Sequence, residues 1–124
     1  MLLLIVINVS VTFPGSNIHA SPSSNQEWKS SFNLEDCNLT PNGSNSYFIL
    51  EPGYQLVLEG QEDGAQIQLK ISVLNETKIV NGTEARVVEE EETEDGEVVE
   101  ISKNWFVVCK PVNDIFYLGE EVDI

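Results

Sequence analysis

Apolar and polar residues alternate without a break from Ala65 to Val73. Successive side chains of a β-strand point to opposite faces of a sheet, so this period of two predicts a strand that is buried on one face. The strand continues to about residue 80, and further strand-like runs lie near 54–59, 83–93 and 97–109 and from 114 onward. No stretch has the pattern of an amphipathic helix. The sequence therefore predicts an all-β fold.

Short turns separate these runs. Asn81-Gly82 and Asp95-Gly96 each stand between two strand-like segments, and such dipeptides favour two-residue hairpin loops because both positions tolerate positive φ. A further turn is expected at residues 111–114, where Pro111 precedes Asp114. We predict an antiparallel meander of about five strands that forms one curved sheet.

The two hairpin turns also predict a strand register. They would place Arg86 opposite Trp105 as a cation–π contact, and Glu91 opposite Glu100. The second pair is repulsive. We therefore expect the far ends of these strands to stand in solvent or to carry a bulge.

Composition divides the chain into three parts. Residues 1–20 are expected to be a signal peptide, residues 21–46 are rich in Ser, Asn and Pro and indicate a flexible linker and lead-in, and residues 47–124 form the meander domain. The last strand signal is followed at once by Ile124, without an element that closes the sheet. We expect the meander to be an incomplete part of a larger domain.

The first segment has the layout of an export signal. An apolar stretch runs from Leu2 to Val9, no charged residue precedes Glu27, and Ala20 followed by Ser-Pro-Ser-Ser gives a cleavage point. The stretch is too short to span a bilayer, which takes about 20 apolar residues. Two alternatives stay open, a segment retained as an anchor and a buried strand.

Asparagine and cysteine usage agrees with export. Sequons for N-glycosylation occur at Asn8, Asn38, Asn42, Asn75 and Asn81. The two cysteines, Cys37 and Cys109, are expected to form a disulfide in an exported chain. Two separate buried thiols are the alternative. We predict a secreted glycoprotein that is extracellular or bound to the cell surface.

The formal charge of −15 excludes several classes of partner. Nucleic acids require clustered Lys and Arg, and anionic lipid surfaces repel an acidic protein. Nine acids stand between residues 84 and 100 against the single cation Arg86. Alternation along a strand divides them between two faces, which disfavours a Ca²⁺ site and favours a solvated hairpin. A catalytic pair of carboxylates is the alternative.

Other chemistry is sparsely represented. The one histidine, His19, lies in the predicted signal peptide, so the mature chain lacks an imidazole for a Ser-His-Asp triad or a His-based zinc site. No phosphate-binding or dinucleotide-binding glycine motif is present. We expect no metal, no cofactor and no catalytic residue. Aromatic residues near the end, Trp105, Phe116 and Tyr117, are candidate contacts for an apolar ligand, or else ordinary core residues.

Three segments together resemble a family of uncharacterised exported β-rich proteins of bacteria and archaea. Residues 45–54 read Asn-Ser-Tyr-Phe-Ile-Leu-Glu-Pro-Gly-Tyr and lead to Glu59-Gly60, similar to a family stretch of Asn-Pro-Tyr-Phe, a Pro-Gly turn and a strand ending in Glu-Gly. Residues 87–89 read Val-Val-Glu and are followed by Glu-Asp-Gly-Glu at 94–97. Asn-Trp-Phe at 104–106 and Phe-Tyr-Leu-Gly-Glu at 116–120 resemble an Asp-Trp-Tyr/Phe triplet and an aromatic strand ending in Gly-Glu.

The chain departs from this family at two positions, Ser46 in place of a proline and Cys109 in place of an acidic residue. The resemblance implies an exported β-rich fold and a longer chain. It implies no activity, because the function of that family is unknown.

These observations favour a non-enzymatic module that binds a small apolar ligand or a cell-surface partner through one face of its sheet. The alternatives are an acid-catalysed glycan hydrolase and a structural component of the cell envelope. A pocket lined by the aromatic residues favours the first, and two close carboxylates with one raised pKa favour the hydrolase.

Overall fold

The computed structural model of the protein describes residues 31–124. The predicted signal peptide, residues 21–30 of the expected linker and the sequon at Asn8 lie outside the described residues. A single compact unit extends from Asn33 to Ile124. Its elements are η1 (Leu34–Asp36), β1 (Asn38–Thr40), β2 (Gly43–Ser44), β3 (Ile49–Leu50), β4 (Gln55–Glu62), β5 (Ala65–Val80), β6 (Thr83–Glu94), β7 (Glu97–Lys110) and β8 (Asp114–Asp123).

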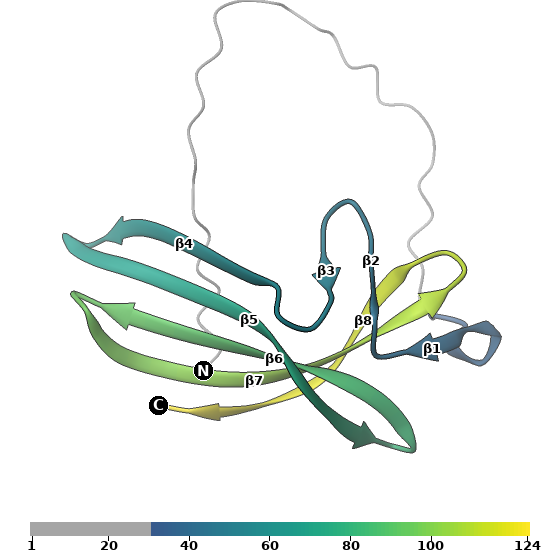
Figure 1. Cartoon of the computed structure of the whole chain (residues 1–124). Helices are drawn as coiled ribbons and strands as arrows, with labels where there is room; N and C mark the ends of the chain where they lie inside the picture. The colour runs from purple at the N-terminus through teal and green to yellow at the C-terminus, as the bar shows by residue number, and fades with distance from the viewer. Residues whose placement is uncertain (1–30) are drawn as a thin grey trace, which may run out of the picture. The chain divides into compact units, whose positions relative to one another are not determined.

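The five long strands β4 to β8 form an antiparallel meander in one curled sheet (Figure 1). Each strand pairs with the next one along the chain, so β4 and β8 are the two edges of the meander. The short strand β1 pairs with β7 at Val108–Lys110, which follows Phe106, the last residue of β7 that pairs with β6. The predicted all-β class and the five-stranded curved meander are confirmed.

Asx-Gly dipeptides make the hairpins. Both predicted Asx-Gly turns are present, and Asp63-Gly64, which was not predicted, forms a third between β4 and β5. The first residue of each turn has φ of 48–49° and the glycine has φ of 80–87°. Only residues that tolerate the left-handed region suit such turns, which explains why Asn or Asp precedes glycine at all three.

Two register shifts modify the predicted pairing. In the β6–β7 pair, Thr93 lies opposite Val98 but Glu92 lies opposite Glu100, so a bulge displaces the rest of β7 by one residue. Arg86 therefore faces Phe106, and the predicted contact with Trp105 is wrong. A second shift interrupts the β5–β6 pair between Val73 and Thr77.

The lead-in segment is part of the fold from residue 33 onward. It contributes η1, β1 and β2, and β2 pairs with β3 in a small second sheet. The side chain of Asn45 shapes this hairpin, because its Oδ1 accepts hydrogen bonds from the backbone N–H groups of Tyr47 and Phe48 at 2.9 Å. Its Nδ2 donates to the carbonyl of Asn113, which ties the hairpin to the β7–β8 turn.

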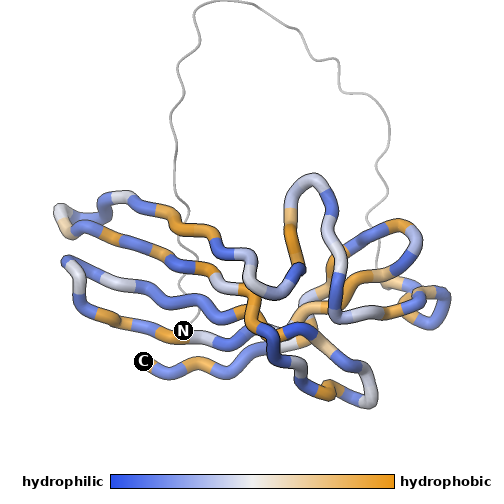
Figure 2. Tube along the Cα trace, in the orientation of Figure 1, coloured by the Kyte–Doolittle hydropathy of each residue, from blue (hydrophilic) through white to orange (hydrophobic). Residues whose placement is uncertain are grey.

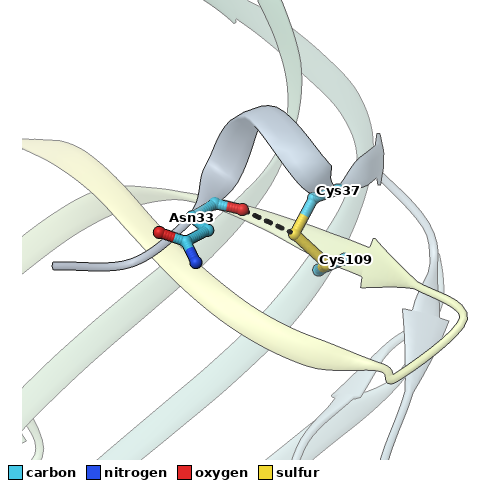
Figure 3. The surroundings of a disulfide bond; sticks show 3 residues. All are labelled: Asn33, Cys37 and Cys109. Carbon is cyan, nitrogen blue, oxygen red and sulfur yellow. Dashed lines mark hydrogen bonds between the residues drawn. A yellow bond between two sulfur atoms is a disulfide. The ribbon is translucent and has the colours of Figure 1, made fainter. Parts of the chain in front are cut away.

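The predicted disulfide between Cys37 and Cys109 is present, with an S–S distance of 2.03 Å and a Cα–Cα distance of 5.0 Å (Figure 3). It joins the residue after η1 to β7. The Asn33 carbonyl oxygen lies 3.8 Å from Cys37 Sγ. A disulfide sulfur carries no proton, so this is a polar contact and not a donated hydrogen bond.

The main buried cluster lies on one face of the sheet, which we call the inner face, whereas Val87 and Val107 are buried on the opposite face. Leu50 of β3 packs on the inner face in a buried cluster with Val73, Val88 and Val108. Partly buried apolar residues surround this cluster, namely Phe48, Ile71, Phe106 and Ile115. Side chains at the alternate strand positions form the outer face. The β2–β3 hairpin thus covers only part of the inner face.

Candidate binding face

The three aromatic residues expected to contact a ligand do not share one face. Tyr117 pairs with Phe106 on the inner face, with ring centroids 5.6 Å apart. Trp105 and Phe116 occupy alternate strand positions and lie on the outer face. The structure therefore does not bring the three together around a single pocket.

Trp105 has a cationic neighbour other than the predicted one. Lys78 Nζ lies 3.9 Å from the centroid of the indole ring. On the strand beside it, Gly119 faces the ring so closely that a Cβ atom there would lie 3.1 Å from two ring carbons. The outer-face aromatic site is therefore already filled by residues of the chain itself.

Carboxylates gather on the part of the inner face that the β2–β3 hairpin does not cover. Glu90 and Glu92 of β6 share the face of Val88, and Glu100 lies directly opposite Glu92. Glu120 of β8 faces Asn104 from the other side of β7. Three adjacent strands therefore contribute acids to one surface.

These acids perturb one another. Burial, followed by the charges of Glu120 and Glu100, raises the pKa of Glu90 above its usual value of 4.5. Burial, followed by the charges of Glu100, Glu62 and Glu94, raises the pKa of Glu92. Burial, followed by the charge of Glu120, a hydrogen bond with that side chain and the charge of Glu90, raises the pKa of Tyr117.

Among residues 31–124, the ion pairs between lysine and carboxylate side chains lie on the outer face. Lys70 pairs with Glu91 at 2.8 Å, and Lys103 lies 3.7 Å from Glu76. A third pair joins Lys78 and Glu121 at 4.0 Å. Within residues 31–124, no ion pair involves an inner-face acid of β6, β7 or β8. The two faces of one sheet therefore differ in how their negative charge is compensated.

An apolar strip borders the inner-face acids. Leu56 and Leu58 of β4 point to this face opposite Ile71 and Leu69 of β5. Figure 2 shows the continuous apolar run of β4 beside the alternating pattern of β5. Leu56 is 39% exposed and Leu58 is 37% exposed, so the strip remains accessible. The uncovered inner face is amphipathic, with apolar side chains on β4 and β5 and carboxylates on β6 to β8.

Two buried polar residues lie beneath the carboxylates. The Asn104 Nδ2 group donates a hydrogen bond to Ser102 Oγ at 3.0 Å, and both residues are buried. Ser102 lies opposite Glu90 in the β6–β7 pair. This polar patch was not predicted from the sequence, because Ser and Asn within a strand carry no pattern that marks them as inward-facing.

Arg86 was also missed as a structural residue. Its side chain is buried, and the guanidinium donates to the carbonyl oxygens of Pro41, Leu74 and Glu76 at 3.2–3.3 Å and to Asn42 Oδ1. Two of these carbonyls belong to the segment of β5 where the register shift interrupts pairing with β6. Arg86 replaces the missing strand hydrogen bonds and takes no part in the exposed surface.

The described residues contain no group of three His, Cys, Asp or Glu side chains arranged to hold a metal ion. In the same part of the chain, no helix has the length and apolar character needed to cross a membrane. The sequon residues Asn38, Asn42, Asn75 and Asn81 are all exposed. The disulfide is compatible with an extracellular location.

No protein-family model, curated protein or solved structure matches this chain. The resemblance to a family of exported proteins therefore stays a prediction, and the site has to be interpreted from its own geometry.

Proposed function

We propose that the protein is an exported, non-enzymatic binding module that takes a cationic, amphipathic partner on the uncovered inner face of its sheet. The observation that carries the proposal is the unequal compensation of charge. Three outer-face acids, Glu76, Glu91 and Glu121, have lysine partners, whereas the inner-face acids of β6 to β8 face one another. A partner that supplies cations to this face relieves the repulsion.

The neighbouring apolar strip defines the partner further. Lysine or arginine side chains alone would satisfy the carboxylates but leave Leu56 and Leu58 in water. A segment that presents cations beside apolar side chains satisfies both parts of the surface. A purely apolar small molecule is a poorer match, because it would desolvate carboxylates without offering them a hydrogen bond or a charge. Of the two partner classes predicted from the sequence, a cell-surface partner is favoured.

Export is part of the same proposal. The signal-like segment at 1–20, the sequons and the resemblance to exported proteins support it. The Cys37–Cys109 disulfide is in keeping with an extracellular or cell-surface location.

A glycan hydrolase is the second candidate. Acid catalysis requires one protonated carboxyl group beside an ionised one. The raised pKa of Glu90 next to Glu100 and Glu120 favours this role. If the protein releases reducing sugar from surface polysaccharides and the Glu90→Gln variant does not, the protein is a hydrolase. If the protein leaves these polysaccharides intact, the binding module is the supported function.

The binding proposal is tested by calorimetric titration of the disulfide-intact protein with a synthetic peptide of alternating Lys and Leu. The Glu90→Gln/Glu100→Gln variant removes two inner-face charges. Its matched control, Glu35→Gln/Glu51→Gln, removes two exposed charges from η1 and from the β3–β4 turn. We expect the inner-face variant to bind at least about tenfold more weakly and the control to change by less than about twofold.

A peptide in which Glu replaces Lys is the control for the ligand and is expected not to bind. Equal weakening in both protein variants would show that only net charge matters, and would overturn the proposal.

A further inference from the structure

The two edges of the sheet are built differently. β8 carries four acids, Asp114, Glu120, Glu121 and Asp123, and a bulge interrupts its pairing between Trp105 and Phe106 of β7. Inserted residues and charges of this kind prevent an edge strand from pairing with another chain. The β8 edge is therefore protected.

β4 carries two acids, Glu59 and Glu62, but lacks the other protective features. Its eight residues pair with β5 in one uninterrupted register and contain no proline, no lysine and no bulge. Three apolar side chains stand in a row in its first half, with exposed fractions of 39% for Leu56, 47% for Val57 and 37% for Leu58. No other strand of residues 31–124 pairs with its free edge. Such an edge is a template for strand addition.

The backbone of β4 fixes which residues are available for pairing. Val73 N–H donates to the carbonyl of Tyr54 at 2.9 Å, so Tyr54 directs its carbonyl toward β5. Hydrogen-bonding groups alternate in direction along an antiparallel strand. Gln55, Val57 and Glu59 therefore direct their N–H and C=O groups toward the free edge.

The sequence of β4 is complementary to itself when two copies run antiparallel about Val57. Val57 then lies opposite Val57 of the second copy, which is a pair between outward-directed residues as the hydrogen-bonding pattern requires. Leu56 lies opposite Leu58 on the inner face. Gln55 lies opposite Glu59, so no acid of the strand faces another acid.

We propose that two copies of this protein associate through antiparallel pairing of their β4 edges, centred on Val57. The pairing continues the sheet from one copy into the other, buries the free backbone edge at Val57 and joins the inner-face apolar strips of the two copies into one. Pairing of β4 with the β8 edge of another copy would give open chains of molecules, but it would bring the acids of β8 against Glu59 and Glu62 and meet a bulge. The symmetric dimer is therefore the favoured assembly.

Analytical ultracentrifugation of the disulfide-intact protein at concentrations from about 1 to 100 μM tests this proposal. The wild-type protein is expected to form dimers, and the dimer is expected to strengthen at about 1 M salt, because screening weakens repulsion between two acidic chains. Val57→Lys places two cations opposite each other on the symmetry axis. It is expected to weaken self-association by at least about tenfold.

Val98→Lys is the matched control, since Val98 is 53% exposed but lies in β7 near the Asp95-Gly96 turn. It is expected to leave self-association unchanged. A monomer at all concentrations, or equal weakening by both substitutions, would overturn the proposal.

Cross-linking tests the register independently of stability. Both native cysteines are in the disulfide, so an introduced cysteine supplies the sole free thiol of each chain. Val57→Cys lies opposite its own copy and is expected to form a disulfide-linked dimer on mild oxidation. Glu59→Cys lies four residues from its copy, roughly 13 Å away along the strand, and is expected to remain monomeric on a non-reducing gel. Equal cross-linking of both variants would contradict pairing about Val57.

Discussion

Replacement of Arg86 by methionine tests the hydrogen bonds by which this residue of β6 joins β5 and the β1–β2 loop. Methionine fills much of the same space but donates no hydrogen bonds. The substitution leaves three carbonyl oxygens and Asn42 Oδ1 without the guanidinium. A net hydrogen bond from a charged donor contributes about 1.5–3 kcal/mol when its geometry is good. Three of these bonds are long, at 3.2–3.3 Å, so we take about 1 kcal/mol each.

Removing the cation also removes the cost of burying it, which offsets part of this loss. We expect Arg86→Met to lower the free energy of unfolding by about 3 kcal/mol, which for a unit of this size lowers Tm by roughly 12–24 °C. Urea unfolding followed by tryptophan fluorescence measures the change, because Trp105 lies on the folded sheet.

Lys70→Met is the control, since it removes a cation whose single pairing with Glu91 is partly exposed. It is expected to cost less than about 1 kcal/mol. If Arg86→Met cost no more than Lys70→Met, the interpretation of Arg86 as the replacement for missing strand hydrogen bonds would be refuted.

Three further substitutions probe other parts of the fold. Cys37→Ser/Cys109→Ser opens a loop with a sequence separation of 72 and is expected to cost about 4 kcal/mol, measured by urea unfolding against the oxidised parent. Glu90→Gln is expected to raise Tm at pH 7, because the folded-state pKa of Glu90 is raised. The protonated Glu90 therefore stabilises the folded protein fully below the ordinary pKa of 4.5, and this stabilisation is lost as pH rises through the raised pKa. Thermal unfolding between pH 4.5 and 7 should show that loss in the parent and a smaller one in the variant. Gly119→Ala introduces a Cβ atom 3.1 Å from the Trp105 ring at φ of 144°, and a loss of about 1–3 kcal/mol is expected by the same assay; an unchanged midpoint would show that the ring can move aside.

Local signals in the sequence were sufficient for the strands and turns. The alternation from Ala65 to Val73 and the Asn81-Gly82 and Asp95-Gly96 dipeptides act through backbone geometry that depends on neighbouring residues alone. The Cys37–Cys109 pair followed from the small number of cysteines in a chain with an export-like start. These features were predicted and are confirmed.

Features that depend on long-range packing were not predictable in the same way. The bulge before Thr93 shifts the register by one residue, and that single shift exchanges the faces that Trp105 and Phe106 present. For the same reason, Glu100 pairs with Glu92 and joins the acids of the inner face. The sequence indicated a repulsive pair, Glu91 with Glu100, and strand ends that either stand in solvent or carry a bulge. It did not indicate that the bulge would bring Glu100 opposite Glu92 on the inner face.

The β2–β3 hairpin shows a similar limit. Leu50 becomes fully buried because a two-residue strand places it on the inner face of a distant sheet. Its sequence context, between Ile49 and Glu51, resembles an irregular segment. Only tertiary packing distinguishes it from a loop residue.

Nuclear magnetic resonance mapping of the peptide site tests the central claim most directly. In a titration with the Lys-Leu peptide, the backbone amides of Glu90, Glu92, Glu100 and Leu56 are expected to shift with a single saturable affinity, while the indole N–H of Trp105 on the outer face is expected to stay in place. Shifts centred on Trp105 and the outer face, or small shifts spread over all acidic residues, would contradict the assignment of the inner face as the binding surface.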